Sequence, residues 1–375
     1  MMNKMNRRDV IGAAGTIAAG TATSALMAQY SERVVRVGCI GVGGRGSRLL
    51  TQLLLIEGVE IRAICDIDPA HLAKAQAMVV EAGQKKPDGL DDWKKLLERT
   101  DIDAVVSALP IDLHADNYID VIASGKDLYG EKPLARTLAE CDRVLEAAKR
   151  GDVIFQVGFQ RRANPFVIAA VKQVHSGDIG ELVEGRIQWS NSWGPLGGWF
   201  GKRERSGDWM VEQAVHNWDV INWATQSLPL RAMGMGRSDL FRDFQPDRNV
   251  HDYYSAVVEY ESGVLVNILH SWVSPEKFNG NHTRLIGVKG GVDFRDGLVS
   301  YRKEQKKPDR QLVDKEETHG DGLSLRAYIN SVRTRKPSVA SVEAGHSATL
   351  AGLLVREAVY TKQIVSVKDL RAKQM

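Results

Sequence analysis

Lys132 is the residue of this chain whose type and surroundings are most informative about chemistry. It stands in Tyr129-Gly130-Glu131-Lys132-Pro133, at the end of a short apolar run. A lysine beside a proline is by itself typical of a solvated turn, so its meaning depends on what surrounds it. Where such an amine lies next to an alcohol, the two groups can share a proton, which is one requirement for oxidising the alcohol carbon.

A second group of polar residues has the spacing of a helix face. Glu212, His216 and Asp219 stand at i, i+4 and i+7, which on one continuous helix places all three side chains on one side. We expect Glu212 to orient His216, so that the imidazole takes a proton from a hydroxyl group. The same spacing is also typical of a solvated helix face, and two carboxylates with an imidazole can hold a metal ion. We predict acid–base chemistry and no metal.

A glycine-rich turn near the start of the chain predicts what lies beside Lys132. Val34–Ile40 is typical of a buried parallel strand, and Gly41-Val42-Gly43-Gly44-Arg45-Gly46 follows it. Its first, third and sixth residues fit G-x-G-x-x-G, which provides a tight turn, close approach of the backbone to a pyrophosphate, and packing of a helix on the strand. Asp66 ends the second strand, where a carboxylate accepts hydrogen bonds from an adenosine ribose and repels a 2′-phosphate. The alternative is a tight turn without a ligand.

We therefore predict a dinucleotide site that prefers NAD, with NADP possible because Arg45 lies inside the turn and can approach a phosphate. Asp68 adds a second negative charge nearby. The expected cofactor contacts are Gly41, Gly43, Gly44, Arg45, Gly46, Asp66, Pro110, His114, Glu131 and Lys132.

The elements around these residues predict two domains after an N-terminal segment. Apolar runs alternate with helical periodicity up to Val153–Val157, which is typical of an α/β Rossmann-type, doubly wound parallel sheet whose ligands lie at the carboxyl ends of the strands. From Leu182 onward strand-like stretches recur, indicating an α+β domain with a large, mostly antiparallel sheet. The predicted divisions are residues 1–30, 31–158 and 159–375.

The glycine turn, Glu131-Lys132-Pro133 and the later acid-and-His segment resemble the Gfo/Idh/MocA family of sugar and polyol oxidoreductases, across nearly everything after residue 33. The resemblance implies that Lys132 contacts the reacting hydroxyl and the nicotinamide. It also implies a cis bond before Pro133, a catalytic role for His216, and C-terminal helices that pack back on the first domain. The chain departs from the commonest family form at Glu212-Gln213-Ala214, which leaves the substrate more open than the mechanism.

Substrate contacts are expected from the crossover between the domains and from a glycine-rich loop. Arg162 and Asn164 lie in the crossover, where anchoring one domain on the other is the alternative role. The loop Asn191–Asp208 and its end carry tryptophans whose flat apolar bodies suit a sugar ring, although most tryptophans are core residues. The expected substrate contacts are Arg162, Asn164, Trp193, Trp209 and Asp219, whereas His251, Tyr253 and His270 are expected to be structural.

The N-terminus resembles a twin-arginine export signal. Arg7-Arg8 precedes Val10–Ala28, a chargeless run rich in Ala, Gly and Thr. We expect the twin-arginine machinery to carry the folded protein, with its cofactor held tightly, to the periplasm. An uncleaved signal that anchors the protein in the membrane is the alternative.

Composition sets the remaining limits. The formal net charge of +3, from 50 Lys and Arg against 47 Asp and Glu, gives no reason to propose a nucleic-acid partner. Cys39, Cys65 and Cys141 lie in predicted core elements, so free buried thiols are expected. An exposed sheet face would favour a homodimer or homotetramer.

The leading hypothesis is an oxidoreductase that moves hydride between a sugar or polyol carbon and a tightly bound nicotinamide cofactor. One alternative is a glycoside-cleaving enzyme that oxidises the sugar transiently, eliminates the aglycone and returns the hydride. A nucleotide-bound sugar-binding protein without turnover is a third hypothesis, against which Lys132, Glu212 and His216 argue.

Overall fold

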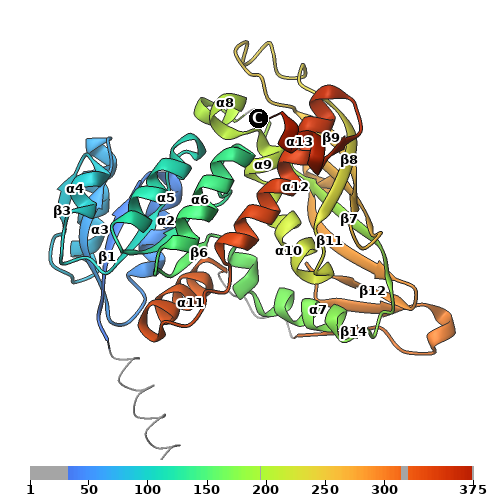
Figure 1. Cartoon of the computed structure of the whole chain (residues 1–375), viewed down its shortest axis with the longest axis horizontal. Helices are drawn as coiled ribbons and strands as arrows, with labels where there is room; N and C mark the ends of the chain where they lie inside the picture. The colour runs from blue at the N-terminus through green and yellow to red at the C-terminus, as the bar shows by residue number, and fades with distance from the viewer. Residues whose placement is uncertain (1–32, 195, 314–319, 374–375) are drawn as a thin grey trace, which may run out of the picture.

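The computed structural model describes residues 33–194, 196–313 and 320–373, which form two sheets with helices between and around them (Figure 1). Sheet A is parallel, in the order β3-β2-β1-β4-β5-β6. Because the order reverses between β1 and β4, a crevice opens at the carboxyl ends of these two strands. The predicted Rossmann-type sheet is confirmed. Its strands are β1 (Val35–Ile40), β2 (Val59–Cys65), β3 (Asp88–Leu90), β4 (Ala104–Ser107), β5 (Asp127–Gly130) and β6 (Phe155–Val157).

The helices of the first domain begin at caps that the sequence supplies. Asp68 accepts hydrogen bonds from the first turn of α3, and Thr137 and Glu140 form a capping box at the start of α6. These helices are α2 (Gly44–Leu53), α3 (Pro69–Glu81), α4 (Trp93–Leu97), α5 (His114–Ala123) and α6 (Leu138–Arg150), with the short 3-10 turn η1 (Ile111–Leu113) before α5.

Sheet B follows the order β14-β13-β12-β11-β7-β10-β9-β8-β15 and is antiparallel except where β7 and β10 run parallel. The predicted second domain with a mostly antiparallel sheet is thereby confirmed. Its strands are β7 (Leu182–Ser190), β8 (Pro229–Arg237), β9 (Tyr253–Tyr260), β10 (Leu265–Ser271), β11 (Gly280–Gly287), β12 (Gly290–Asp293), β13 (Leu298–Tyr301), β14 (Arg310–Gln311) and β15 (Val365–Ser366).

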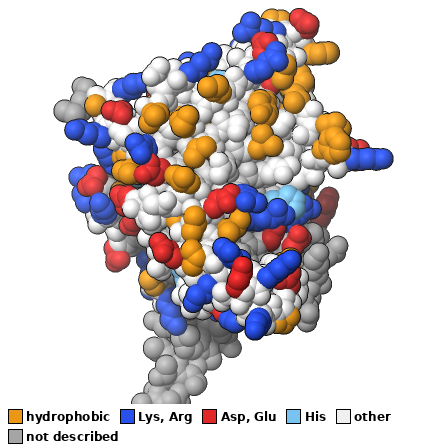
Figure 2. Space-filling model, turned by 90° about the vertical axis from the view of Figure 1, so that its right-hand side faces the viewer, with side chains coloured by type: hydrophobic (Ala, Val, Ile, Leu, Met, Phe, Trp, Pro, Cys, Tyr) orange, Lys and Arg blue, Asp and Glu red, His pale blue; other side chains and the backbone are white. Residues whose placement is uncertain are grey.

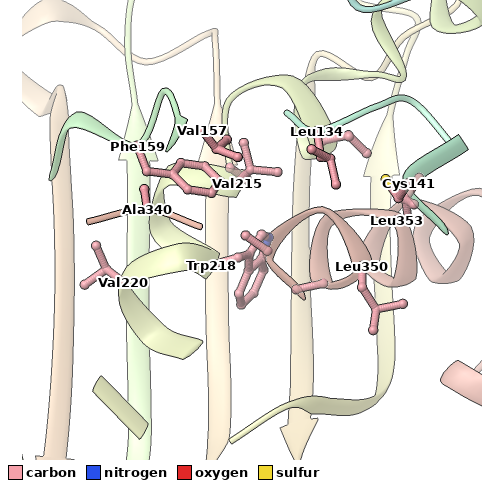
Figure 3. Packing of buried hydrophobic residues seen from close by; sticks show 14 of the residues in the cluster. Leu134, Cys141, Val157, Phe159, Val215, Trp218, Val220, Ala340, Leu350 and Leu353 are labelled. Carbon is pink, nitrogen blue, oxygen red and sulfur yellow. The ribbon is translucent and has the colours of Figure 1, made fainter. Parts of the chain in front are cut away.

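One face of sheet B is covered and the other is open. On the covered face, Trp218 of α10 packs with Leu350 and Leu353 of α12, and the same apolar cluster reaches Leu134, directly after Pro133, and Phe159 of the crossover (Figure 3). On the open face, hydrophobic side chains are spread among charged ones (Figure 2). The helices of this half are α7 (Pro165–His175), α8 (Arg203–Ser206), α9 (Trp209–Glu212), α10 (Val215–Thr225), α11 (Gly320–Thr334), α12 (Val342–Thr361) and α13 (Val367–Ala372); 3-10 turns are η2 (Gln160–Ala163), η3 (Gly198–Gly201), η4 (Glu276–Phe278) and η5 (Lys303–Gln305).

The C-terminal helices join the two sheets. α12 contacts α6 and β6 on one side and β8 on the other, and α11 packs on α2 and β1 of the first domain. Leu325, Tyr328, Ile329 and Val332 of α11 belong to the same buried cluster as the apolar residues of β1 and α2. The second half of the chain thus supplies part of the first domain's core.

Cys39, Cys65 and Cys141 are free and buried, as predicted. Burial raises the pKa of both Cys39 and Cys65 to about 12, so these thiols are uncharged at neutral pH. Among the described residues no helix has the length and apolarity that crossing a bilayer requires. The predicted export signal, residues 1–30, lies outside the described residues.

Candidate active site

The glycine turn after β1 has two kinds of glycine. A Cβ added to Gly46 would lie 1.8 Å from the carbonyl oxygen of Gly41, and one added to Gly41, whose φ is +75°, would lie 2.6 Å from the carbonyl oxygen of Ala108. Both positions therefore exclude a side chain. By contrast, a Cβ on Gly43 would meet only the His71 ring, at 3.5 Å, and one on Gly44 would meet nothing within 4 Å.

The open space beside Gly43 and Gly44 fits a phosphate group. No side chain caps the N-terminus of α2, so its first backbone N–H groups are available to an anion, and the helix dipole favours negative charge there. The roles predicted for Gly41 and Gly46, a tight turn and close packing of helix on strand, agree with this geometry.

A cleft of about 730 Å³ extends from this turn along the carboxyl ends of the strands. Four carboxylates, those of Asp66, Asp68, Asp91 and Asp92, line one end of it. Asp66 accepts hydrogen bonds from the backbone N–H of Val42, at 2.7 Å, and of Asp68, at 2.9 Å, which fixes it at the tip of β2. Because a 2′-phosphate would be repelled by this acidic end, the cleft suits NAD.

Lys132 lies at the other end of the cleft and is the first residue of the cis Lys132–Pro133 bond that the resemblance predicted. Its Nζ donates to the carbonyl oxygen of Glu212, at 2.7 Å, and to the carboxylate of the same residue. Both side chains are largely buried. These hydrogen bonds join Lys132, which lies just beyond the carboxyl end of β5, to the second domain.

The prediction that Glu212 orients His216 is wrong. Glu212 is the last residue of α9 and His216 lies on α10, so the two side chains do not share one continuous helix. Gln213 and Ala214 separate the helices, and the Gln213 amide oxygen contacts His270 Nε2 at 3.2 Å. This change of direction turns Glu212 toward Lys132.

His216 is buried, and its Nδ1 has no hydrogen-bond partner among the described residues. Its ring lies 6.1 Å from that of Phe159 and 6.4 Å from that of Trp189, measured between centroids. Burial, followed by the positive charges of Lys132, Arg161 and Arg45, holds the pKa of His216 well below its usual range. The imidazole is therefore neutral at physiological pH and able to accept a proton.

Arg45 lines the cleft but is engaged elsewhere than expected. Its Nε donates to Glu131 at 2.8 Å, and its two Nη atoms donate to Asp321 of α11 at 2.7 and 2.9 Å. Glu131 in turn accepts from the backbone N–H of Lys132 at 3.2 Å. The prediction that Arg45 approaches a phosphate is not supported, because both of its carboxylate partners hold the guanidinium in place.

Two further cofactor predictions differ in outcome. Pro110 lines the cleft, but His114 is buried beneath it and does not. The two ring nitrogens of His114 lie 2.8 Å from the carbonyl oxygen of Pro133 and 2.9 Å from that of Leu109. His114 therefore supports the loops that carry the site.

Of the predicted substrate contacts, Trp209 is wrong because it is fully buried, whereas Arg162 and Asp219 bind each other and stay predictions. Trp209 is fully buried, and its indole N–H donates to the carbonyl oxygen of His251. Arg162 Nε donates to both carboxylate oxygens of Asp219, at 2.8 and 3.0 Å, so each group is occupied by the other. Burial raises the pKa of Asp219 to about 6 even with Arg162 beside it.

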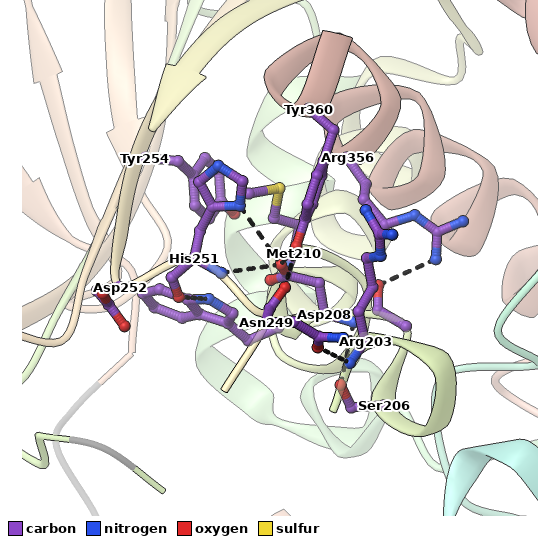
Figure 4. A network of polar contacts seen from close by, with 12 residues as sticks. Arg203, Ser206, Asp208, Met210, Asn249, His251, Asp252, Tyr254, Arg356 and Tyr360 are labelled. Carbon is purple, nitrogen blue, oxygen red and sulfur yellow. Dashed lines mark hydrogen bonds and ion pairs between the residues drawn. The ribbon is translucent and has the colours of Figure 1, made fainter. Parts of the chain in front are cut away.

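The remaining predicted substrate and polar-aromatic residues have structural contacts. Asn164 caps α7, and its side chain also lines a second cavity described below. Trp193 is 57% exposed and meets Trp272 edge to face. His270 is buried between Tyr254 and Gln213, and His251 lies in a polar network with Asp208 and Tyr360 (Figure 4).

Sequence reasoning placed residues 198–206 in a loop suited to a sugar ring but did not predict that they form a strap, which crosses from the second domain onto the cleft. Its Trp199 and Arg205 line the cleft opposite the glycine turn. Two contacts fasten it to the first domain: Arg205 Nε donates to Asp112 at 3.1 Å, and Arg136 donates to the carbonyl oxygen of Glu204 at 2.6 Å. The sequence signal was present in the basic residues of the glycine-rich loop.

The strap is also anchored at its far end. Asp208, directly after it, has a φ of +69° and accepts hydrogen bonds from the backbone N–H of His251, at 3.1 Å, and from the Tyr360 hydroxyl, at 2.7 Å (Figure 4). A non-glycine residue in this conformation costs about 1–3 kcal/mol, which these contacts offset. The network fixes the point where the strap gives way to α9 and Glu212.

A parallel sheet whose glycine turn opens on an acidic cleft, with a lysine at the far end of the cleft whose charge acts on a buried, neutral histidine, is typical of a nicotinamide-dependent oxidoreductase. Models of one family match both halves of the chain: the NAD-binding Rossmann fold of the GFO/IDH/MocA oxidoreductase family matches residues 35–159, and the GFO/IDH/MocA C-terminal domain matches residues 167–293. The chain therefore belongs to the Gfo/Idh/MocA family and is an NAD-binding oxidoreductase, as the resemblance predicted.

Two curated relatives and one solved structure show the breadth of that family. An inositol 2-dehydrogenase from Acidothermus cellulolyticus is 28% identical over 86% of this chain and 91% of its own length. A glycosyl hydrolase family 109 protein from Shewanella pealeana is 29% identical over 76% of this chain and 73% of its own. A structure of levoglucosan dehydrogenase with NADH covers 89% of this chain and 99% of its own, with a TM-score of 0.78 at 19% identity, which supports the fold alone.

Proposed function

We propose that the substrate of this NAD-binding oxidoreductase is a sugar or polyol, oxidised at one hydroxyl-bearing carbon. The observation that carries the proposal is that Lys132 lines the end of the cofactor cleft, while burial and the charge of Lys132 keep the pKa of the buried His216 well below its usual range. When bound, the nicotinamide accepts a hydride from that carbon or returns one to it. The inositol 2-dehydrogenase relative supports a polyhydroxylated ring as the substrate class.

Each side chain has a separate task in this proposal. His216 accepts the proton of the substrate hydroxyl, because burial and nearby cations keep its imidazole uncharged. Lys132, held by Glu212, donates a hydrogen bond to the substrate oxygen and stabilises the negative charge that develops there. Glu212 is thus a positioning residue for Lys132. The carbon loses a hydride and the oxygen a proton, so the alcohol becomes a carbonyl.

The test compares dinucleotide binding with turnover in Lys132→Ala and His216→Ala. Removing a proton-transfer group should lower kcat by about 10²–10⁴-fold. Dinucleotide content, measured after denaturation, should remain at the wild-type level because the glycine turn and the acidic end are intact. Wild-type kcat in either variant would refute the assignment of the reacting groups, and absence of any dinucleotide affinity in the wild-type chain would refute the proposal as a whole.

A glycoside-cleaving reaction is the second candidate, and the similarity to the glycosyl hydrolase family 109 protein favours it. Oxidation of a ring hydroxyl acidifies the neighbouring C–H, so that the aglycone can be eliminated, and return of the hydride makes the overall reaction redox-neutral. The experiment is incubation with aryl glycosides while aglycone release and NADH absorbance are followed together. Release without net NADH supports cleavage, whereas NADH formation in step with substrate loss supports dehydrogenation.

We also propose that the enzyme acts outside the cytoplasm, after twin-arginine export. The support is Arg7-Arg8 followed by the chargeless run Val10–Ala28. Replacing both arginines with lysine should leave the protein in the cytoplasmic fraction of cells that export the unaltered chain. Equal amounts in the periplasmic fraction would contradict this proposal, and recovery of the wild-type chain in the membrane fraction would favour a retained anchor.

The open face of sheet B supports a homo-oligomer. Met233 and Met235 of β8 are 51% and 68% exposed, and Leu230 and Leu265 extend the apolar surface across β8 and β10. We propose that two copies bury this face against each other, as dimers or as pairs within a tetramer. Replacing Met233 and Met235 with lysine should shift the mass measured by light scattering toward a monomer, and an unchanged mass would place the interface elsewhere.

A further inference from the structure

A second, smaller cavity of about 350 Å³ lies between α7, α10 and β11, and nothing above assigns it a ligand. Its polar lining consists of Arg161, Asn164, Asn281, Thr283 and Arg295. No carboxylate is among the described residues that line it. The cavity is therefore rich in positive charge and in hydrogen-bond donors.

Arg161 is the cation that most needs a partner. Within the described chain its guanidinium makes no hydrogen bond and no ion pair, and it lies over the Trp189 ring at 5.6 Å from the centroid. The nearby carboxylate of Asp219 is occupied by Arg162. Burial lowers the pKa of Arg161 to about 10, so it stays charged at neutral pH. A partly buried, unpaired cation is costly, and a bound anion would remove that cost.

The other polar groups offer donors to the same space. The amide oxygen of Asn281 accepts a hydrogen bond from Asn217, at 3.3 Å, and that of Asn164 accepts one from the backbone N–H of Phe166, at 2.9 Å. Each amide therefore keeps its NH₂ group for a ligand. Arg295, whose Nη1 contacts His282 Nε2 at 2.9 Å, adds a second positive charge.

The cavity adjoins the proton acceptor. Val220, which lines it, stands one helical turn after His216 on the same face of α10. Trp189 connects the two places, because its ring lies 6.4 Å from the His216 ring and beneath Arg161. A ring substrate whose hydroxyl reaches His216 would extend a substituent toward Arg161.

We propose that this cavity binds an anionic group, a carboxylate or a sulfate, carried by the sugar whose hydroxyl reaches Lys132 and His216. The inference rests on the proposed function, since it narrows the substrate class to acidic sugars. Arg161 forms charge-assisted hydrogen bonds to the anion, and Asn281 and Arg295 complete its coordination.

The experiment measures binding to the full-length, NADH-loaded protein by calorimetry, with matched pairs of ligands. D-glucuronate is compared with D-glucose, D-galacturonate with D-galactose, and D-glucose 6-sulfate with D-glucose. For at least one kind of anion, the acidic sugar should bind about 10- to 100-fold more tightly than its neutral partner, as expected for one or two charge-assisted hydrogen bonds. Preference for the uronates identifies a carboxylate, and preference for the sulfated sugar identifies a sulfate.

Arg161→Gln should reduce the preference for the acidic ligand to less than about threefold while leaving the weak binding of the neutral partner unchanged. Arg186→Gln is the matched control, because Arg186 pairs with Glu184 on the exposed side of β7 and lies outside both cavities. Circular dichroism of each variant checks the fold. If Arg161→Gln does not fold, competition in the wild-type protein gives the same information: inorganic sulfate should weaken binding of the preferred acidic sugar and leave binding of its neutral partner unchanged, and absence of this competition overturns the inference.

Four outcomes would contradict the proposal, and they separate failure of the anion site from failure of the sugar substrate. Equal affinity for acidic and neutral partners, or a preference that survives Arg161→Gln, refutes the anion site and leaves the oxidoreductase assignment intact. Tighter binding of N-acetylhexosamines than of uronates or the sulfated sugar likewise refutes it. Failure of every carbohydrate to bind a protein that retains NADH refutes the proposed sugar substrate itself.

Discussion

The two ends of the active site are built from opposite charges and from different parts of the chain. At the adenosine end, backbone and carboxylates define the space: Gly43 leaves room for a phosphate, and Asp66 and its acidic neighbours line the wall. At the reacting end, side chains from three separate segments converge, and Lys132 and Arg161 make it positive. The cofactor end thus selects a ligand through shape and repulsion, whereas the reacting end stabilises negative charge.

This difference explains how one cleft serves two purposes. Burial, followed by the repulsion of nearby cations, lowers the pKa of His216 and keeps its imidazole neutral, while the acidic end excludes a third phosphate without a dedicated partner. Substitutions at the first end should therefore change which dinucleotide binds, and substitutions at the second should change chemistry at constant cofactor affinity.

The largest expected effect is a loss of stability in Gly46→Ala, which should be absent in Gly43→Ala of the same turn. Gly46→Ala places a Cβ 1.8 Å from the Gly41 carbonyl oxygen and should lower the free energy of unfolding by about 3 kcal/mol, measured by urea denaturation. Gly43→Ala meets only the His71 ring at 3.5 Å, so the fold should persist while NAD affinity falls at least about tenfold. Normal NAD affinity in Gly43→Ala would show that the pyrophosphate does not approach this backbone.

Charge at the adenosine end is tested by Asp66→Asn, which keeps a hydrogen-bond acceptor but removes the negative charge. The ratio of NAD to NADP affinity should fall by about tenfold or more, because a 2′-phosphate no longer faces this carboxylate. Asp116→Asn, on the exposed surface of α5, is the control. An unchanged ratio would mean that the remaining carboxylates alone set the preference.

The strap should govern how long the cofactor stays. Arg205→Gln removes a cation that lines the cleft and its contact with Asp112, and the dissociation rate of NADH, followed by fluorescence, should rise about tenfold. Arg203→Gln makes the same change two residues earlier, where the guanidinium lies over the Tyr360 ring outside the cleft, and should leave the rate unaltered. Equal NADH dissociation rates in both variants would show that Arg205 of the strap does not help to retain the cofactor.

The smallest expected effect concerns pH. Because the folded pKa of His216 lies well below its usual value, its neutral form persists as pH falls, and kcat/KM should show no acid limb near pH 6.5. Arg161→Gln removes one of the cations that disfavour the imidazolium, so any acid limb should move to higher pH. A limb near pH 6.5 in the wild-type protein would indicate a solvated histidine.

Local patterns predicted the glycine turn and the place of Asp66 at the tip of the second strand, but not the contacts of Arg45, His114 or Glu212. The glycine turn and Asp66 follow from the steric needs of a single βα unit, so their sequence suffices. The break between Glu212 and His216 depends on tertiary contacts, among them those of Asp208 with His251 and Tyr360 and of Gln213 with His270. A pattern of i, i+4 and i+7 contains none of that information.

Neighbouring residues of the same type were also indistinguishable in the sequence. Arg161 and Arg162 are adjacent, yet one is unpaired beside a cavity and the other is bound to Asp219. Trp209 and Trp199 belong to the same stretch of chain, yet the first is core and the second lines the cleft. Only the packing of distant segments assigns such residues to the site or to its support.

The position of α11 bears on how the protein is made. Its Asp321 holds Arg45 of the glycine turn, and its apolar face completes the core beneath β1 and α2. A ribosome must therefore release the chain beyond Thr334 before the nucleotide-binding half can close around its ligand. We expect the isolated N-terminal half to be an incompletely folded intermediate that exposes apolar surface and aggregates readily. Cofactor binding is then one of the last events of biogenesis rather than one of the first.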